Sequence, residues 1–179
     1  MRFEPTSLDG VWLVHLDPMR DERGLFARTF CVNEFRAHGL ETSFPQHSIS
    51  CSNRKGTVRG MHFQRAPHGE VKLVRCLSGA IWDVVIDMRP TSPTFRQWRG
   101  FELSAENQDQ IYIPKGFAHG FQTLSDNAQV NYLISELYAP GAASGVRYDD
   151  PAFRVTWPLP VSVISDKDLR WPDFQPDAH

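Results

Sequence analysis

The sequence has little of three features that would each identify a class of protein. No run approaches the roughly 20 apolar residues of a membrane-spanning helix. The first five residues include an acid and a proline, where a signal peptide needs an apolar segment. The formal net charge is only −2, so no general excess of basic residues favours nucleic acids. We therefore expect a cytoplasmic protein that binds neither membranes nor nucleic acids.

Cysteine is also scarce. The three cysteines, Cys31, Cys51 and Cys76, are odd in number, far apart and without a C-x-x-C spacing. A small secreted protein that depends on disulfides has closely spaced cysteines in even number. We expect reduced thiols, which agrees with a cytoplasmic location.

What the sequence does contain is a series of short strand-forming runs. Glycine, proline, asparagine and aspartate interrupt them about every ten residues, as in a sandwich or barrel. With 179 residues and no linker, the chain is expected to form one domain over residues 1–179. The predicted fold is an all-β jelly roll with a few short helices. The expected strands are 11–16, 25–30, 46–51, 57–64, 71–77, 80–88, 98–103, 109–113, 118–124, 129–137 and 154–156.

Three local features complete the predicted fold. Residues 21–24 read as a turn, and a helix is expected around residues 32–38, ended by Gly39. The proline-rich tail carries Trp157 and Trp171, and we expect it to pack over the barrel.

The segment 58–64, followed closely by Lys72, is the most informative part of the chain. Alternation in a strand would place Arg59 on one face and His62 on the other, unless a bulge intervenes. A lysine in a central strand is expensive to bury without a partner. His62 alone fits a hydrogen-bonded core histidine, and Lys72 alone fits an edge position. Together with Arg59 they favour a cationic pocket for an anionic substrate that reacts through an enolate.

A second cluster, 114–121, has the spacing Pro-x-Gly-x-x-His and ends near His119. This spacing resembles the second half of the cupin signature, in which the histidine is a metal ligand. A three-ligand site from His62, Glu70 and His119 is one interpretation, although Gln64 stands where such proteins have a second histidine. A structural histidine bonded to a turn is the other.

Two further segments carry chemistry that depends on their surroundings. Tyr132 shares one face with Ile134 and Glu136, and Tyr138 joins them if the strand stays regular. Such tyrosines usually only pack, but a nearby lysine would favour the ionised phenol and suit proton transfer. The segment 164–169 is a solvated turn unless one of its aspartates reaches a histidine.

Seven segments, in order, resemble the dTDP-4-dehydrorhamnose 3,5-epimerase family of nucleotide-sugar epimerases. They extend over nearly the whole chain, and the ordered set is much more specific than any one of them. The segments are 21–26, 56–64, 72–75, 83–89, 92–95, 114–121, and Trp157–Pro158 with 165–168.

The resemblance implies a cupin-type jelly roll, a homodimer that exchanges N-terminal strands, and catalysis without metal or other cofactor. His62 would remove a proton beside the 4-keto group of a nucleotide-diphosphate sugar, with Asp168 orienting its imidazole. Lys72 would stabilise the enolate oxygen, and Tyr132 would return a proton on the opposite face.

The resemblance also implies a set of substrate-binding residues. Arg23 and Arg59 would hold the diphosphate, and Arg23 and Phe26 would come from the partner subunit. The remaining binding residues would be Gln46 and Phe26 near the base, Tyr138 near the sugar nucleotide, and His119 in the pocket wall.

Two positions depart from the family pattern. Arg28 stands where the family commonly has a glutamate that helps to recognise the base, and Ser48 where it commonly has asparagine. An arginine donor cannot read the same edge of thymine as a carboxylate acceptor. The carrier nucleotide, dTDP or CDP, therefore stays open, as does epimerisation at C3, C5 or both.

The sequence-based conclusion is a cofactor-independent epimerase of deoxysugar biosynthesis. Two alternatives remain at this stage. One is a metal-dependent cupin oxygenase or isomerase, and the other is a cupin that binds sugar nucleotides without turnover.

Overall fold

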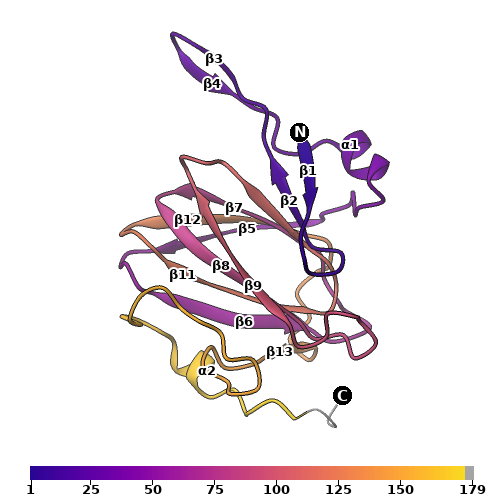
Figure 1. The fold of residues 1–179 in the computed structure, drawn as a ribbon, viewed down its shortest axis with the longest axis vertical. Helices are drawn as coiled ribbons and strands as arrows, with labels where there is room; N and C mark the ends of the chain where they lie inside the picture. Colours follow the sequence, from indigo (N-terminus) through magenta and orange to yellow (C-terminus); the bar gives the residue numbers. More distant parts are fainter. Residues whose placement is uncertain (176–179) are drawn as a thin grey trace.

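The computed structural model describes residues 1–175, which form two antiparallel sheets packed face to face (Figure 1). The six-stranded sheet has the order β1 (Arg2–Pro5), β2 (Trp12–His15), β10 (Gln110–Ile113), β7 (Lys72–Ser78), β12 (Ala128–Ile134) and β5 (Gln46–Ser52). The five-stranded sheet has the order β13 (Ala143–Gly145), β6 (Val58–Gln64), β11 (Phe117–Thr123), β8 (Ala80–Asp87) and β9 (Trp98–Ser104). The prediction of an all-β jelly roll is confirmed.

The main core lies between the two sheets. Val74 and Val130 of the six-stranded sheet pack in one cluster with Val85 and Phe121 of the five-stranded sheet, and all four are buried. Alternation in β8 directs Val84 to the other face of its sheet. The five-stranded sheet is therefore apolar on both faces and needs a second covering layer.

The C-terminal segment supplies that layer. Phe153, Trp157 and Phe174 pack in one cluster with Val84 and Ile86 of β8. Figure 1 shows this segment (yellow) running along the outer side of β6 and β13. The expectation that the proline-rich tail packs over the barrel is confirmed, and this placement brings the short helix α2 (Asp166–Leu169) against β6.

The N-terminal region adds a helix and a hairpin to the six-stranded sheet. Helix α1 (Val32–Ala37) ends before Gly39, whose φ of 69° is the left-handed conformation expected of a residue that terminates a helix. The strands β3 (Met19–Asp21) and β4 (Gly24–Phe26) form a hairpin around the predicted turn. Figure 1 shows this hairpin projecting away from the sheets. Within residues 1–175, no helix is long and apolar enough to span a membrane.

Two predicted strands are wrong. Residues 154–156 form no strand, because Arg154 has a φ of 54°, which breaks an extended chain. The predicted strand 25–30 stops at Phe26, where the hairpin pairing ends. Four elements were not predicted, because each is too short to show a periodic pattern: β1, β3, β13 and α2.

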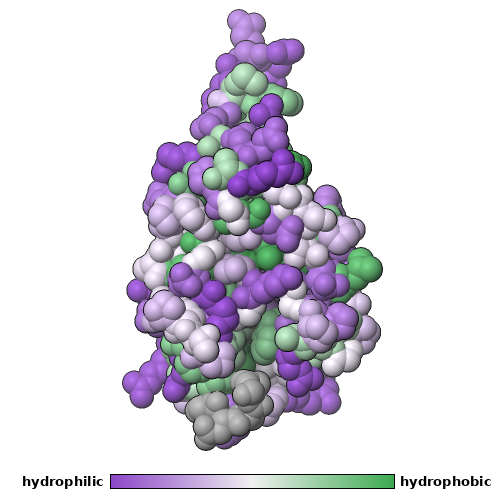
Figure 2. All heavy atoms as spheres, turned by 90° about the vertical axis from the view of Figure 1, so that its right-hand side faces the viewer, coloured by the Kyte–Doolittle hydropathy of each residue, from purple (hydrophilic) through white to green (hydrophobic). Residues whose placement is uncertain are grey.

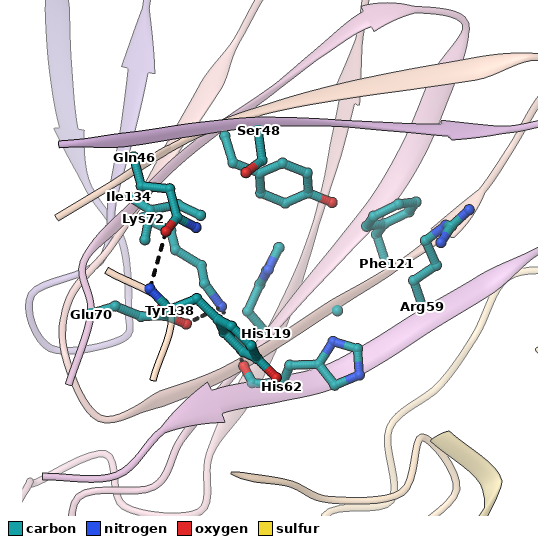
Figure 3. Close-up of a pocket in the computed structure, with 12 residues that line it drawn as sticks. Gln46, Ser48, Arg59, His62, Glu70, Lys72, His119, Phe121, Ile134 and Tyr138 are labelled. Atoms are coloured by element: carbon teal, nitrogen blue, oxygen red, sulfur yellow. Dashed lines mark hydrogen bonds and ion pairs between the residues drawn. The ribbon is translucent and has the colours of Figure 1, made fainter. Parts of the chain in front are cut away.

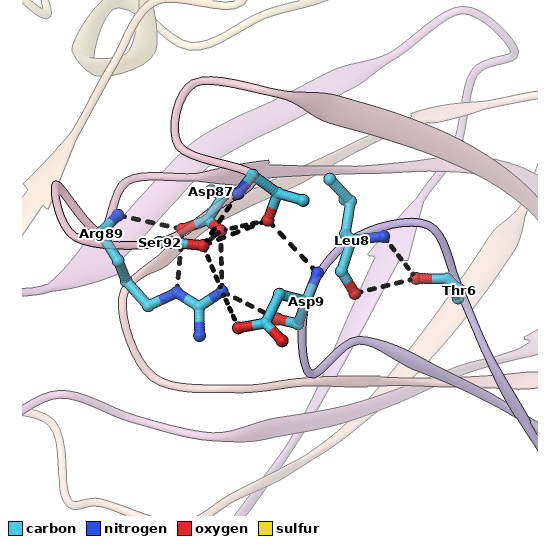
Figure 4. Close-up of polar contacts among 7 residues, drawn as sticks. Thr6, Leu8, Asp9, Asp87, Arg89 and Ser92 are labelled. Carbon is cyan, nitrogen blue, oxygen red and sulfur yellow. Dashed lines mark hydrogen bonds and ion pairs between the residues drawn. The ribbon is translucent and has the colours of Figure 1, made fainter.

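A buried carboxylate ties the N-terminal loop to the end of β8 (Figure 4). Asp87 is fully buried and accepts hydrogen bonds from the Arg89 guanidinium at 2.7 Å and from the Thr94 hydroxyl at 2.6 Å. Arg89 also donates to the Asp9 carbonyl at 2.8 Å, and Thr94 accepts from the Asp9 amide. Burial acts to raise the pKa of Asp87, but these hydrogen bonds, with one from the Ser92 hydroxyl, outweigh it and hold the pKa below its usual range.

Replacing Asp87 by asparagine is expected to lower the free energy of unfolding by roughly 3 kcal/mol at pH 7, because it removes the buried carboxylate partner of Arg89 and leaves only the ion pair with the exposed Asp9 at 3.3 Å. A depressed pKa in the folded state means that the ionised carboxylate stabilises the fold above the unfolded pKa of about 4. This contribution is lost as the pH falls below that value. Denaturant titrations at pH 3 to 7 should therefore show the difference from wild type narrowing below pH 4. Asp9→Ala, at an exposed side chain, is the control and should cost less than about 1 kcal/mol.

Candidate active site

A pocket of about 230 Å³ opens between the two sheets (Figure 3). Strands β5, β7 and β12 of the six-stranded sheet form one wall, and β6 and β11 of the five-stranded sheet form the other. Of the ten catalytic and substrate-binding residues that the family resemblance implies, seven line it: Gln46, Arg59, His62, Lys72, His119, Tyr132 and Tyr138. The fold therefore brings together side chains from five strands.

Arg59 and His62 face the same pocket because β6 is irregular between them. His62 pairs with His119 and Arg59 with Phe121, so three steps along β6 match two steps along β11. Gly60 lies in this step with a φ of 126°, and a Cβ added there would lie 2.5 Å from the Gly120 Cα. Only glycine fits such a backbone approach. The strict alternation considered for this strand does not apply.

His62 is held by a carboxylate from the other end of the chain. Its Nε2 lies 2.6 Å from Asp168 Oδ1, and the second oxygen of Asp168 accepts from the Gly60 amide at 3.3 Å. The His62 side chain is 43% exposed, whereas that of Asp168 is 6% exposed. Burial acts to raise the pKa of Asp168, but the hydrogen bond and charge of His62 outweigh it, so the pKa lies below its usual range. The ionised Asp168 accepts a hydrogen bond from Nε2–H of His62, which leaves the lone pair of the neutral imidazole on Nδ1.

Lys72 has a carboxylate partner inside the pocket. Its Nζ lies 2.8 Å from Glu70 Oε1 and 3.5 Å from the carbonyl oxygen of His62. Both charged side chains line the pocket, and Figure 3 shows the ammonium between Glu70 and the His62 backbone. Lys72 is thus a partnered charge in a central strand, and the edge position considered from the sequence is wrong.

His119 forms a second histidine–carboxylate pair. Its Nε2 lies 2.8 Å from Asp83 Oδ2, and the Asp83 side chain is completely buried. Among the described residues, Asp83 Oδ1 has no hydrogen-bond partner. Burial raises the pKa of Asp83, and the charge and hydrogen bond of His119 offset this only in part.

Tyr132 projects from β12, on the wall opposite His62. Its ring makes an edge contact with His119 at a centroid distance of 6.2 Å. Burial, and after it the charge of Asp83, raise the pKa of the phenol well above its usual range. The sequence-based expectation that Lys72 would favour the ionised phenol is therefore wrong, because burial dominates. A phenol that stays protonated is suited to donating a proton.

Comparison with known proteins agrees with this arrangement. A sequence model of the dTDP-4-dehydrorhamnose 3,5-epimerase family matches residues 5–176. The chain belongs to this family.

Individual members are similar over nearly their full length. The dTDP-4-dehydrorhamnose 3,5-epimerase of Methanothermobacter thermautotrophicus is 47% identical, over 95% of this chain and 92% of the relative. The crystal structure of the Bacillus anthracis enzyme with TDP and PPi bound is 39% identical with a TM-score of 0.94, and the match covers 97% of this chain and 99% of that one. The dTDP-4-dehydrorhamnose 3-epimerase of Streptomyces niveus is 37% identical, over 94% of this chain and 81% of the relative. The chain is thus similar both to 3,5-epimerases and to a 3-epimerase, which are named for two sugar carbons and for one.

The other residues that the family resemblance singles out divide into two groups. Arg59 lies in the pocket and donates to the Cys51 carbonyl and the Ser52 hydroxyl, both at 3.0 Å. Gln46 accepts a hydrogen bond from the Tyr138 amide at 3.0 Å, which joins two residues at the pocket wall. Arg23 and Phe26 lie apart from this pocket, on the projecting hairpin.

The two departures from the family pattern lie in different places. Ser48 lines the pocket, next to Gln46 in β5. Arg28 follows the hairpin and lies 3.4 Å from Glu34 of α1. The arginine therefore pairs with a carboxylate of the same chain and does not reach the described pocket.

The three-ligand metal set considered from the sequence is not assembled. His62 Nε2 faces Asp168, His119 Nε2 faces Asp83, and Glu70 faces Lys72. In residues 1–175, no group of three or more histidine, cysteine, aspartate and glutamate side chains is arranged to hold a metal ion.

Sequence reasoning missed two carboxylates of the site. Asp83 gave a signal, because it is a charged residue inside the apolar run 81–86 of a strand buried on both faces. Glu70 was considered only as a metal ligand. Its spacing of two residues from Lys72 was a usable signal, since residues i and i+2 of an extended chain share a face.

Proposed function

We propose that this protein epimerises a dTDP-linked 4-keto-6-deoxyhexose at the carbons beside the keto group. The reaction belongs to deoxysugar biosynthesis and needs no metal or other cofactor. His62 is the base, Asp168 orients it, Lys72 stabilises the enolate, and Tyr132 donates the proton on the opposite face.

The observation that carries this proposal is the placement of the base and the acid on opposite sheets. His62 projects from β6 of one sheet, and Tyr132 projects from β12 of the other. A flat enolate bound between the sheets is reached by His62 on one face and by Tyr132 on the other. Removal on one face and return on the other inverts the carbon.

The proton balance of the step is simple. Nδ1 of His62 takes the proton from the carbon beside the keto group, and the C–H electron pair forms the enolate. The Lys72 ammonium stabilises the negative oxygen, where preorganised positive charge is most effective. Tyr132 then donates its phenolic proton to the carbon, and solvent exchange restores both groups for the next turnover.

The charges of the pocket also support an orientation of the substrate. His62, His119 and Lys72 each have a carboxylate partner, whereas Arg59 bonds only to a backbone carbonyl and a hydroxyl. Within residues 1–175, Arg59 is thus the pocket cation without a carboxylate partner. We place the diphosphate at Arg59, the sugar between His62 and Tyr132, and the base toward Gln46 and Tyr138.

The test is proton NMR of dTDP-4-keto-6-deoxyglucose with the protein in D₂O. We expect deuterium at C3, at C5 or at both, and the pattern identifies the centres that are epimerised. Exchange with the CDP-linked sugar and not with the dTDP-linked sugar would show that the substrate carries CDP. That result would agree with Arg28, which stands where the family commonly has a base-reading glutamate. Tight binding without exchange of either sugar would contradict the epimerase and favour a binding protein.

We also propose a homodimer that exchanges the β3–β4 hairpins. Met19, Leu25 and Phe26 are exposed on the hairpin, and Phe26 is 67% exposed. Figure 2 shows apolar surface on the projecting end of the molecule. The outer face of the six-stranded sheet exposes Ile49 at 57% and includes Arg75, whose guanidinium has no polar partner within residues 1–175. Burial lowers the pKa of Arg75, and a partner subunit would supply the missing contacts, while its hairpin would bring Arg23 and Phe26 to the pocket.

Ile49→Asp is expected to convert the dimer to a monomer, because it places a charge in the centre of the proposed interface. Sedimentation velocity at micromolar concentration measures the change. The matched control is Val163→Asp, at a partly exposed position in the C-terminal segment, and this variant should stay dimeric. A wild-type monomer, or a dimeric Ile49→Asp variant, would contradict the proposed interface.

Two wider expectations remain predictions. The proposal of one domain over residues 1–179 is supported by the core that both sheets share. The proposal of a cytoplasmic location is supported by the three cysteines, none of which forms a disulfide.

A further inference from the structure

Glu70 is a buried charge that the proposed reaction does not use. It precedes β7, and its carboxylate lies 2.8 Å from Lys72 Nζ. The two side chains are 12% and 11% exposed, and both line the pocket. Figure 3 shows the carboxylate directed at the ammonium from the same wall. An anion at this place is unexpected in a pocket for a negatively charged substrate.

The pairing has a clear physical effect on Lys72. A buried ammonium is stable only when a nearby group compensates its charge. The ammonium has three N–H donors. Glu70 accepts one at 2.8 Å, and the carbonyl oxygen of His62 at 3.5 Å is a long second contact. These two contacts aim the lysine and leave a donor for a substrate oxygen.

The Glu70–Lys72 pair also affects which pocket cation binds the diphosphate and which one contacts the reacting sugar. Because Glu70 compensates Lys72, Arg59 on the opposite sheet is the pocket cation that has no carboxylate partner in the described part of the chain. A diphosphate is therefore drawn to Arg59, and Lys72 stays available to the reacting end of the sugar.

We propose that Glu70 is a positioning residue for the reaction, which acts by holding the Lys72 ammonium charged and aimed at the keto oxygen. This inference rests on the proposed function. Glu70 does not touch the reacting atoms, so its effect on turnover passes through Lys72. The other titratable groups around Lys72 are Tyr132, Tyr138, Arg59, two histidines, His62 and His119, and, behind His119, Asp83.

The decisive variant is Glu70→Gln, which keeps an oxygen acceptor at the same reach and removes the charge. The matched control is Glu136→Gln, at a half-buried carboxylate that bonds to the amide of the next residue. NMR of the lysine side chain at carbon Cε follows the charge of Lys72 directly. We expect Lys72 to lose its proton at least about one pH unit lower in Glu70→Gln than in wild type, because the compensating charge is gone. Glu136→Gln should titrate as wild type does.

Turnover should show the same coupling. In Glu70→Gln we expect kcat to fall about tenfold, while the affinity for dTDP stays within about twofold of wild type. In the pH profile of kcat, the decrease at high pH should begin at a lower pH than in wild type. In a Lys72→Met background, Glu70→Gln should have no further effect on deuterium exchange, because the group it acts through is absent.

Two results would overturn the inference: an unchanged Lys72 titration in Glu70→Gln, or an equal loss of exchange in the Lys72→Met background. A purely structural role would lower stability without moving the titration. A wild-type protein that exchanges no deuterium would instead overturn the proposed function, while the Lys72 titration still decides whether Glu70 holds the charge.

Discussion

Replacing His62 by alanine is expected to lower deuterium exchange beside the keto group by about 10²- to 10⁴-fold, the usual contribution of a positioned base. The imidazole lies on the pocket wall, with Nε2 directed at Asp168, so that Nδ1 carries the lone pair. No other described histidine has both this position and this exposure, because His119 is buried against Asp83. Proton NMR in D₂O measures the exchange rate.

Two further measurements test whether the loss of exchange comes from the missing base and not from weaker binding or a general effect of removing a histidine. Calorimetric titration with dTDP should give the wild-type affinity within about twofold, since in the proposed orientation Arg59, and not His62, holds the diphosphate. The matched control is His68→Ala, at an exposed histidine outside the pocket, and it should exchange at the wild-type rate. Wild-type exchange in His62→Ala would disprove the assignment of the base.

Replacing Tyr132 by phenylalanine is expected to separate exchange from inversion. The variant keeps the ring that contacts His119 and loses only the phenolic proton. His62 and Lys72 still form the enolate, so deuterium enters the substrate carbon from the His62 face. The inverted product should form about 10²- to 10⁴-fold more slowly, because the opposite wall no longer donates a proton.

The measurement compares, in one NMR time course, the deuterium that enters the substrate with the epimer that forms. The matched control is Tyr148→Phe, at a tyrosine outside the pocket whose ring lies at a tilt to that of Trp157, and its product should form at the wild-type rate. An unchanged rate of inversion in Tyr132→Phe, or an equal loss of exchange and inversion, would contradict the proposed role of the phenol.

The fold was largely predictable because long strands carry a periodic signal. β6, β7 and β8 have seven or eight residues each and were predicted to within one or two residues. The elements that were missed have three or four residues. The four-residue strands β2 and β10 were predicted because both lie in apolar runs, 11–16 and 109–113, whereas β1, β3 and β13 lie in no such run and form by pairing with a neighbouring strand. Helix α2 is a single turn, too short for a helical period to show.

Most members of the site were predictable, but their contacts were not. The charged residues of β6 and β7 stood out because burying them is costly. The bulge that aligns Arg59 with His62 was not visible, because it arises where the Gly60 and Gly120 backbones meet. The pKa of Tyr132 was predicted in the wrong direction, because burial, which no spacing reveals, outweighs the effect of the charges.

The sequence by itself determined the class of fold, the family and most of the residues that carry charge or protons, because these depend on residue type and local order. The family resemblance already implied that Asp168 serves His62, but only the tertiary structure showed that Asp83 pairs with His119 and Glu70 with Lys72. Asp168 reaches His62 across 106 positions of the chain, and Asp83 reaches His119 across 36. Such pairs form where separate strands and the C-terminal segment pack together, since the strength of an ion pair depends on distance and burial in space and not on separation along the chain.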